Sequence, residues 1–355
     1  MRNRKRGKLI IFWNVLIVTV GIVLTVGYYR SLQTLAPVRE ASLTGLATPL
    51  HLWPKGPSLQ RHLYRLLSLD QPGICVFVVG LEDKPRSDGL AVLLGQPKPG
   101  PGNLKRVRAL RPSQLAEVIQ AATSRPDGIE TIPGTKTRLH ASSSALNNSL
   151  SPWHIGSFSH LLALHTAMRD NCSSVLVIED DMSLDLMPYW EDTISELVLK
   201  YLRNHVDSMM LELKVAAYDD IGSSGELGLE RLFPDCSCRI AVPYKPLVSW
   251  GAGAYLVNAR GIRRVIKPFK YAQNPDCLDL DKFIQQSPLA DLGLIYTIEN
   301  TRTLWPPYFL EDMSARSATR EDDEALGLFK RVHISSGYAA IWANIMRASL
   351  CHRVI

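Results

Sequence analysis

Residues 173–181 read SSVLVIEDD, and this stretch decides how the rest of the chain is interpreted. Four apolar residues, Val175–Ile178, three of them β-branched, lead directly into three carboxylates. Such a run predicts a strand that is buried on both faces, as at the centre of a parallel sheet. In open α/β sheets, ligands bind off the carboxyl ends of the strands, so the acids should stand at a ligand-binding edge.

The three acids, Glu179, Asp180 and Asp181, repel one another unless a cation neutralises them. Clustered carboxylate oxygens suit Mg²⁺ or Mn²⁺, particularly where a phosphate shares the ion. The stretch therefore suggests a divalent cation bound together with a nucleotide diphosphate. The alternative interpretation is a solvated turn after a core strand.

The chain begins with a basic segment, residues 2–8, followed by an uncharged apolar run over residues 9–29. The run is close to the ~20 residues that a helix needs to cross a bilayer. Because basic residues precede it, we expect residues 1–8 to be a cytoplasmic tail and the remainder to be lumenal. No clear small-residue cleavage site follows, which favours a transmembrane signal anchor over a removed signal peptide.

The positive charge of the chain is concentrated at this end. The whole chain has 40 Lys and Arg against 34 Asp and Glu, a net charge of +6. Residues 1–30 hold six of the basic residues and no acid, so the remainder is neutral. The charge is therefore a membrane-topology signal, and it does not indicate nucleic-acid binding, which needs a basic patch in the folded part.

Beyond the anchor, composition divides the chain into three parts. Residues 30–72 are punctuated by proline and glycine and are expected to form a stem, with a short helix over Ser58–Leu69. Residues 73–315 are expected to form the catalytic domain. Residues 316–355 are expected to form a C-terminal helical extension.

Strand and helix signals alternate within residues 73–315, which indicates an α/β fold with a mostly parallel central sheet. Ile74–Gly80 predicts the first strand, and Pro112–Thr123 predicts a helix with proline in its first turn. Residues 292–298 predict the last strand, and residues 304–309 predict a rigid loop after it.

A further helix should lead into the central strand. Ser157 or Ser159 could cap its start, which would place His160 in the first turn, where a hydrogen-bond donor could meet a ligand. The alternative for His160 is a purely structural role.

Two loop segments are candidates for substrate contacts. Arg86 lies in a polar loop after the first strand, a natural place for a nucleotide contact or simply a solvated loop. Trp250 and Gly251 open a run of small residues, which lets the backbone approach a ligand or a neighbouring strand closely. The alternative there is an ordinary core tryptophan beside a strand bulge.

Two more groups of acids follow. Asp276, Asp279 and Asp281 should stand at a helix start, where capping is the alternative to chemistry. Residues 321–324 read EDDE, but no buried strand delivers them, so we interpret them as a solvated helix start.

Six cysteines have a spacing that fits no zinc framework. In an oxidising lumen some of them should pair, whereas Cys75, in a buried strand, is expected to be a free thiol. Asn147 and Asn171 are glycosylation acceptors if the domain is lumenal.

The chain resembles glycosyltransferase family 25, which includes bacterial lipopolysaccharide-type and animal collagen-type galactosyltransferases. Four blocks within roughly residues 74–315 carry the likeness, in the order found in the family. They are the strand at Val76–Val79 with its charged loop, Ser159–Leu161 followed by Leu176–Asp181, Trp250–Gly251 with Ala254–Leu256 and Gly261, and an acid near Asp276 or Asp279 followed by Trp305–Pro307 before Ser314. The chain departs from the family at residues 151–156, SPWHIG, where the family usually has Gly-Glu-Ile-Gly or similar.

The resemblance implies a GT-A fold, a nucleotide-sugar-binding α/β sheet with a metal-dependent acid motif. Asp181 would bind Mn²⁺ or Mg²⁺ directly, assisted by Glu179. Glu179 and Asp180 would also hold the ribose, metal-bound water or the sugar, and Trp250–Gly251 would lie beside the donor or acceptor sugar. Asp279, with Asp276 next, would be the acceptor-side base, for which reach matters before pKa.

We therefore expect a metal-dependent hexosyltransferase, a single-pass type II protein of the Golgi or endoplasmic reticulum membrane. It would move a sugar, with UDP-galactose favoured as donor, to a glycan or protein acceptor. One alternative is another Golgi transferase with an N-acetylglucosaminyl or N-acetylgalactosaminyl donor. The other is an inactive, membrane-anchored glycan-binding protein.

Overall fold

The computed structural model describes residues 57–80, 90, 93, 104–146, 152–184, 186–187, 190–204, 208–214, 240–243, 252–286, 294–296, 298, 300–305 and 307–311. The chain divides into two units, Met1–His51 and Leu52–Ile355, and every described residue belongs to the second. The expected anchor at residues 9–29 and the expected extension at residues 316–355 lie outside the described residues. Among those that are described, no helix is both long and apolar enough to cross a membrane.

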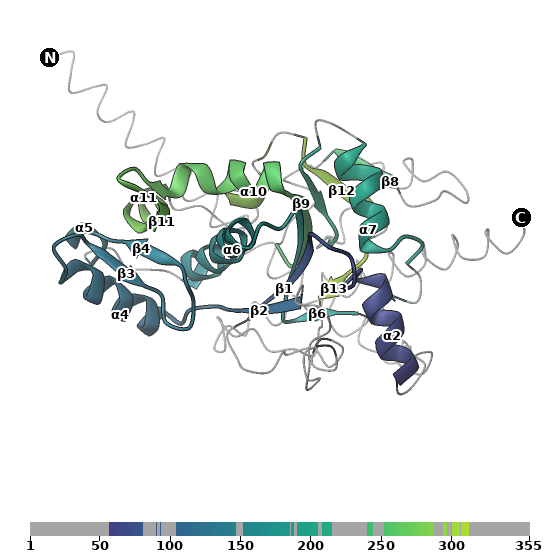
Figure 1. The fold of residues 1–355 in the computed structure, drawn as a ribbon, viewed down its shortest axis with the longest axis horizontal. Helices are drawn as coiled ribbons and strands as arrows, with labels where there is room; N and C mark the ends of the chain where they lie inside the picture. The colour runs from purple at the N-terminus through teal and green to yellow at the C-terminus, as the bar shows by residue number, and fades with distance from the viewer. Residues whose placement is uncertain are drawn as a thin grey trace, which may run out of the picture. The chain divides into compact units, whose positions relative to one another are not determined.

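The described part is a mixed α/β fold around a seven-stranded sheet with the order β2-β1-β5-β9-β7-β12-β8 (Figure 1). Its strands are β1 (Ile74–Gly80), β2 (Leu104–Arg108), β5 (Ser174–Glu179), β7 (Met210–Glu212), β8 (Ile240–Pro243), β9 (Ala254–Asn258) and β12 (Arg302–Trp305). β2, β1, β5, β7 and β12 run in one direction, whereas β9 and β8 run in the other. The prediction of an α/β fold with a mostly parallel central sheet is confirmed.

Two smaller sheets accompany the central one. A four-stranded sheet has the order β10-β11-β4-β3, and a two-stranded sheet pairs β13 with β6. Their strands are β3 (Ile129–Thr131), β4 (Arg138–His140), β6 (Met182–Ser183), β10 (Lys270–Tyr271), β11 (Asn274–Asp279) and β13 (Leu310–Glu311).

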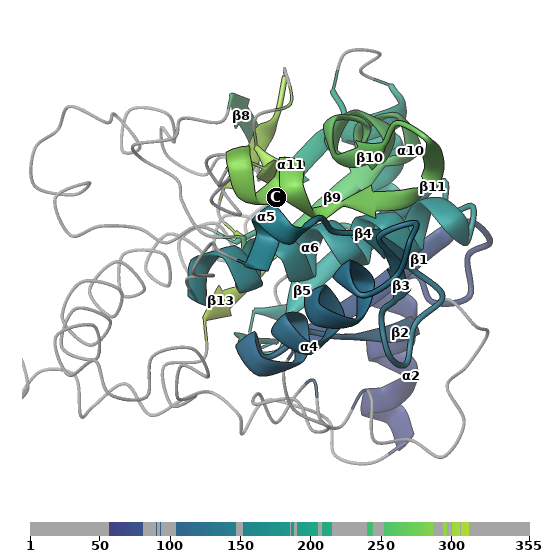
Figure 2. The same cartoon turned by 90° about the vertical axis from the view of Figure 1, so that its left-hand side faces the viewer.

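Helices cover both faces of the central sheet. They are α2 (Pro57–Leu66), α4 (Pro112–Thr123), α5 (Ser143–Leu146), α6 (Pro152–Arg169), α7 (Ile194–Leu197), α10 (Ala259–Ile266) and α11 (Leu280–Gln286), with a π-helical turn η3 (Val198–Arg203) and a 3₁₀ turn η4 (Lys267–Phe269). Figure 1 shows α6 and α10 on one side of the sheet and α2 and α7 on the other. In Figure 2, α6 lies in front of β5 and β9.

The central strand is buried on both faces, as its unbroken apolar run predicts. Val175 and Val177 belong to the core cluster on the α6 side, and Leu176 and Ile178 belong to the cluster on the α2 side. Because successive side chains point to opposite faces, a strand between two helical layers needs apolar residues at every position.

The helix expected over Ser58–Leu69 is present as α2. Its residues Leu63 and Leu66, together with Leu67 and Leu69 just after it, are buried in the α2-side core. The end of the expected stem therefore packs into the folded domain.

The expectation that Cys75 is a free thiol is wrong, because Cys75 forms a disulfide with Cys172. Cys75 points to the α6 face, and Cys172 lies in the turn that joins α6 to β5, the neighbour of β1. The two sulfurs meet through strand pairing between segments 97 residues apart, which no local pattern reveals. Among the described residues, Cys277 is a free, buried thiol.

The start of α6 also differs from the expectation. The helix begins at Pro152. A proline suits the first turn of a helix because the backbone N–H that it lacks would have no partner within the helix at that position. Ser159 is not a cap, since its hydroxyl donates to the carbonyl of Ile155 inside the helix at 2.7 Å. His160 therefore lies in the middle of the helix, not in its first turn.

Two further expectations on local structure need correction. Asp276 and Asp279 lie in β11, and only Asp281 stands in the first turn of a helix. Leu294 and Ile295 form part of a π-helical turn instead of a strand, and the last strand of the central sheet is β12, over residues expected in part to be a loop. An apolar run can be buried as strand or helix, and β12 is fixed by its pairing with β7 and β8.

Candidate functional site

The acids after β5 stand at a point where the order of the sheet reverses. β1 has β2 on one side and β5 on the other. The chain therefore runs from β1 to β2 on one side and later returns to β5 on the other side of β1. In open α/β sheets, the crevice outside the carboxyl ends of two such strands is the usual ligand site. Gly80 ends β1 and Glu179 ends β5, and the acids follow there.

Asp180 lies against the end of β1. Its backbone N–H donates to the carbonyl of Val79 at 2.9 Å, and its side chain is buried. The carboxylate occupies the position where a Cβ on Gly80 would be, so only glycine fits there. The glycine that ends β1 is thus needed to make room for the Asp180 side chain, which follows β5.

Glu179 is held from the α6 side by a chain of hydrogen bonds. His160 Nε2 lies 2.9 Å from Glu179 Oε1, and His160 Nδ1 lies 3.2 Å from the hydroxyl of Tyr255. An ionised carboxylate can only accept, so Nε2 donates to Glu179 and the phenol donates to Nδ1. Burial, and then the charge of Glu179, raises the pKa of Tyr255 well above its usual value, so the phenol keeps the proton that it donates.

Asp181 is buried and leads directly into β6, which pairs with β13. In that pairing Glu311 lies opposite Met182, the residue after Asp181. Another buried acid, Glu212 at the end of β7, accepts a hydrogen bond from the Thr303 hydroxyl at 2.6 Å.

Lys214 brings a cation to the same end of the sheet. Its Nζ lies 3.5 Å from Glu311 Oε2, and both side chains are buried. Burial by itself would lower the pKa of Lys214, but the nearby carboxylates of Glu311, Glu179, Asp181 and Glu212 outweigh burial and raise it. The lysine is therefore charged at neutral pH.

Sequence reasoning missed Glu212, Lys214 and Glu311. A signal for two of them exists in residues 208–214, SMMLELK, where charged residues alternate with leucines in an apolar run. Charged side chains are almost never fully buried unless they are paired, so a charge on the buried face of a strand points to a partner.

The charge at this end is strongly negative. Four carboxylates, those of Glu179, Asp181, Glu212 and Glu311, act on one buried lysine, and Asp180 adds a fifth acid next to them in the chain. Hard, anionic oxygen donors are the kind that Mg²⁺ or Mn²⁺ prefers. Within the part of the chain that the structure describes, however, the group that brings three ligand atoms within 4.8 Å of one another is a different one, His140, Asp279 and Asp281.

The second group of acids lies elsewhere. The ligand atoms of Asp279, Asp281 and His140 lie within 4.8 Å of one another, a grouping that could hold a metal ion. Asp279 Oδ1 accepts from the backbone N–H of Lys282 at 3.1 Å, and so caps α11. Asp281 accepts from the N–H and hydroxyl of Ser142 at 2.8 and 3.0 Å. Asp279 and Asp281 thus both form hydrogen bonds that stabilise the local structure. Asp276 is exposed.

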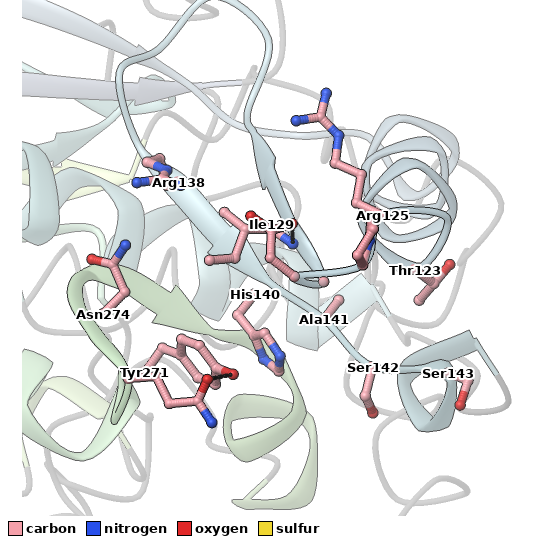
Figure 3. Close-up of a pocket in the computed structure, with 14 residues that line it drawn as sticks. Thr123, Arg125, Ile129, Arg138, His140, Ala141, Ser142, Ser143, Tyr271 and Asn274 are labelled. Carbon is pink, nitrogen blue, oxygen red and sulfur yellow. Dashed lines mark hydrogen bonds between the residues drawn. The ribbon is translucent and has the colours of Figure 1, made fainter.

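A pocket of about 540 Å³ opens beside this group (Figure 3). His140 and Tyr271 form one of its walls, with their rings stacked at 3.7 Å. Figure 1 shows β4, β11 and α11 at the left-hand end of the described fold, apart from β6 and β13. The structure therefore brings Glu179, Asp180, Asp181 and His160 together and places Asp276 and Asp279 apart from them.

Three of the expected substrate residues, Arg86, Trp250 and Gly251, lie outside the described residues. Comparisons of the chain with protein-family models and with curated proteins find no match to either.

Proposed function

We propose that the chain is a metal-dependent glycosyltransferase of GT-A type, with galactose from UDP-galactose as the favoured sugar. The observation that carries the proposal is the acid end of β5, where three carboxylates stand at the reversal point of a mostly parallel sheet. The resemblance to glycosyltransferase family 25 supports the same reading.

In this proposal each residue at the acid end of β5 has a different role. Asp181 and Glu179 would hold Mn²⁺ or Mg²⁺, which offsets the negative charge that develops on the leaving diphosphate. Asp180, fixed against Gly80, would orient the ribose or the sugar. His160 and Tyr255 hold the carboxylate of Glu179 in place, so His160 is a positioning residue in this proposal.

In the proposed reaction, a hydroxyl of the acceptor attacks the anomeric carbon of the donor sugar. The bond from that carbon to the diphosphate oxygen breaks, and the hydroxyl proton passes to a base. The sequence-based candidate for this base, Asp279, lies in the second sheet, and its role stays a prediction.

The setting agrees with a lumenal enzyme. Disulfides such as Cys75–Cys172 form and persist in oxidising compartments, and the basic start and apolar run over residues 9–29 predict a signal anchor. The proposed protein is therefore a type II membrane protein of the Golgi or endoplasmic reticulum that modifies glycans or proteins there.

The test is turnover of a panel of nucleotide sugars by the full-length protein in detergent with Mn²⁺. We expect hydrolysis or transfer with UDP-galactose, and a loss of about 100-fold or more in Asp181→Asn, which keeps the shape but removes a metal-binding charge. Asp322→Asn, in the EDDE run, is the matched control and should retain activity.

Equal behaviour of the two variants would show that the wrong acidic run has been chosen. Preference for a UDP-N-acetylhexosamine would point to another Golgi transferase. Sugar binding without turnover of any donor would favour the alternative of an inactive glycan-binding protein.

A further inference from the structure

Lys214 is unusual among the lysines of the described residues because its side chain is only 6% exposed. Its aliphatic stem packs against the backbone of Gly253, where a Cβ would lie 3.2 Å from the Cδ of Lys214. The carbonyl of the same glycine accepts from the N–H of Glu179 at 2.7 Å. The lysine therefore runs alongside the residue that ends β5.

The backbone fixes this placement from two sides. The N–H of Lys214 donates to the carbonyl of Ala254 at 3.3 Å, and Lys214 forms an isolated parallel bridge with Phe309. Two residues further on, Glu311 pairs with Met182, next to Asp181. The ends of β7, β9, β6 and β13 thus meet around Lys214.

The charge of the lysine matters because several carboxylates share this low-dielectric end of the sheet. Like charges that are kept from water repel strongly, and a buried carboxylate is tolerated where a cation or hydrogen bonds compensate it. The ammonium forms an ion pair with Glu311, and Glu179, Asp181 and Glu212 also raise the pKa of the lysine from nearby.

We propose that Lys214 is the internal counter-ion of the acid end, which holds Glu179, Asp181 and Glu311 together when no divalent cation is bound. The site is then formed before a cation and a nucleotide diphosphate arrive, and Glu311 fixes where the ammonium lies. The proposal deepens the proposed function and rests on its metal site, but its stability test can be read separately.

The experiment compares melting temperatures of full-length wild-type protein, Lys214→Met and Lys214→Arg in EDTA and in Mn²⁺. Methionine keeps most of the stem but removes the charge. We expect Lys214→Met to melt several degrees below wild type in EDTA and Mn²⁺ to recover most of that loss, because a bound cation replaces the missing one. Lys214→Arg should melt close to wild type under both conditions.

Titration calorimetry supplies a readout that packing alone would not move. With one positive charge fewer beside the site, Lys214→Met should bind Mn²⁺ several-fold more tightly than wild type. Lys282→Met is the matched control, because its ammonium lies 3.5 Å from Asp279 in the second sheet and is 42% exposed. It should change neither the manganese affinity nor the manganese dependence of melting.

Melting of Lys214→Met that equals wild type in EDTA, or a loss that manganese does not recover although manganese binds, would overturn the proposal. If wild type and all variants bind no Mn²⁺, the metal site of the proposed function fails instead. The double variant Lys214→Met, Glu311→Gln then decides the counter-ion role. It should melt above Lys214→Met alone, since it removes one of the negative charges that Lys214 offset, and equal melting would overturn the role.

Discussion

Two histidines on one helix show how neighbours decide what an imidazole does. His160 lies between the Glu179 carboxylate and the Tyr255 phenol, so both of its nitrogens have partners in one chain of hydrogen bonds. His165 is one and a half turns further along α6, where its Nδ1 lies 3.3 Å from the Thr137 hydroxyl and its ring also hydrogen-bonds the backbone of Asp276. Burial, and then the cations Arg169 and Lys270, lower the pKa of His165 to about 4.

The lowered pKa of His165 predicts a loss of stability in acid. Between its unfolded value of 6.5 and about 4, the unfolded chain binds a proton that the folded protein does not, so stability falls as pH drops through this window. The loss attributable to this group is at most roughly 3 kcal/mol. In His165→Gln, which cannot titrate, the free energy of unfolding from urea denaturation should fall less between pH 7 and pH 4 than in wild type.

His154→Gln is the matched control for this measurement. His154 stands in the first turn of the same helix and is only partly buried. Its variant should keep the pH dependence of wild type. An unchanged pH dependence in His165→Gln would mean that other groups, and not this imidazole, carry the acid sensitivity.

At the scale of elements, β1 and β5 form the framework of the site. They pair in parallel from Ile74–Ser174 to Val79–Glu179, which brings Gly80 beneath Asp180. The Cys75–Cys172 disulfide joins the same two segments near the other end of the pair. The register of these two strands is therefore secured at both ends, by a covalent bond at one and a close backbone approach at the other.

The disulfide should make a large contribution to stability because it closes a loop between residues 97 apart. Loop closure of that length restricts the unfolded chain, and removing the bond typically costs about 2–4 kcal/mol. We expect the double variant Cys75→Ala, Cys172→Ala to lose stability in this range in urea denaturation.

Reductant separates the cross-link from lost packing. Dithiothreitol should lower the stability of wild type toward that of the double variant and leave the double variant unchanged. Cys277→Ala, which removes a buried free thiol, should remain sensitive to the reductant. Wild-type protein that is insensitive to reductant while unfolding would contradict the predicted contribution.

At the scale of the whole molecule, the chain divides into a short N-terminal unit and a long one that carries the sheet. The first 30 residues hold the whole excess of positive charge, and the remainder is neutral. The proposed type II topology would place this basic segment on the cytoplasmic side of the membrane.

The predicted topology is testable with the full-length protein carrying a C-terminal epitope in sealed microsomes. Residues 31–355 should resist added protease until detergent opens the membrane, because the bilayer shields a lumenal domain. A cytoplasmic marker protein provides the control for protease activity. Digestion of the epitope without detergent would overturn the topology.

The sequence by itself determined the elements whose signals are local. Ile74–Gly80 and Pro112–Thr123 are a strand and a helix with the predicted bounds, and the apolar run before Glu179 is the central buried strand. These predictions succeed because burial on both faces demands an unbroken apolar run and a proline suits a helix start.

Only the tertiary structure decided which side chains meet. Strand pairing brings Cys75 to Cys172, and the packing of α6 on β5 brings His160 to Glu179. Lys214 meets Glu311 where the ends of four strands lie together. The same packing placed Asp279 in a second sheet, although it and Asp181 look alike in the sequence. The physical reason is that periodicity reports only which face of an element is buried, whereas the order and register of the strands choose the partners on that face.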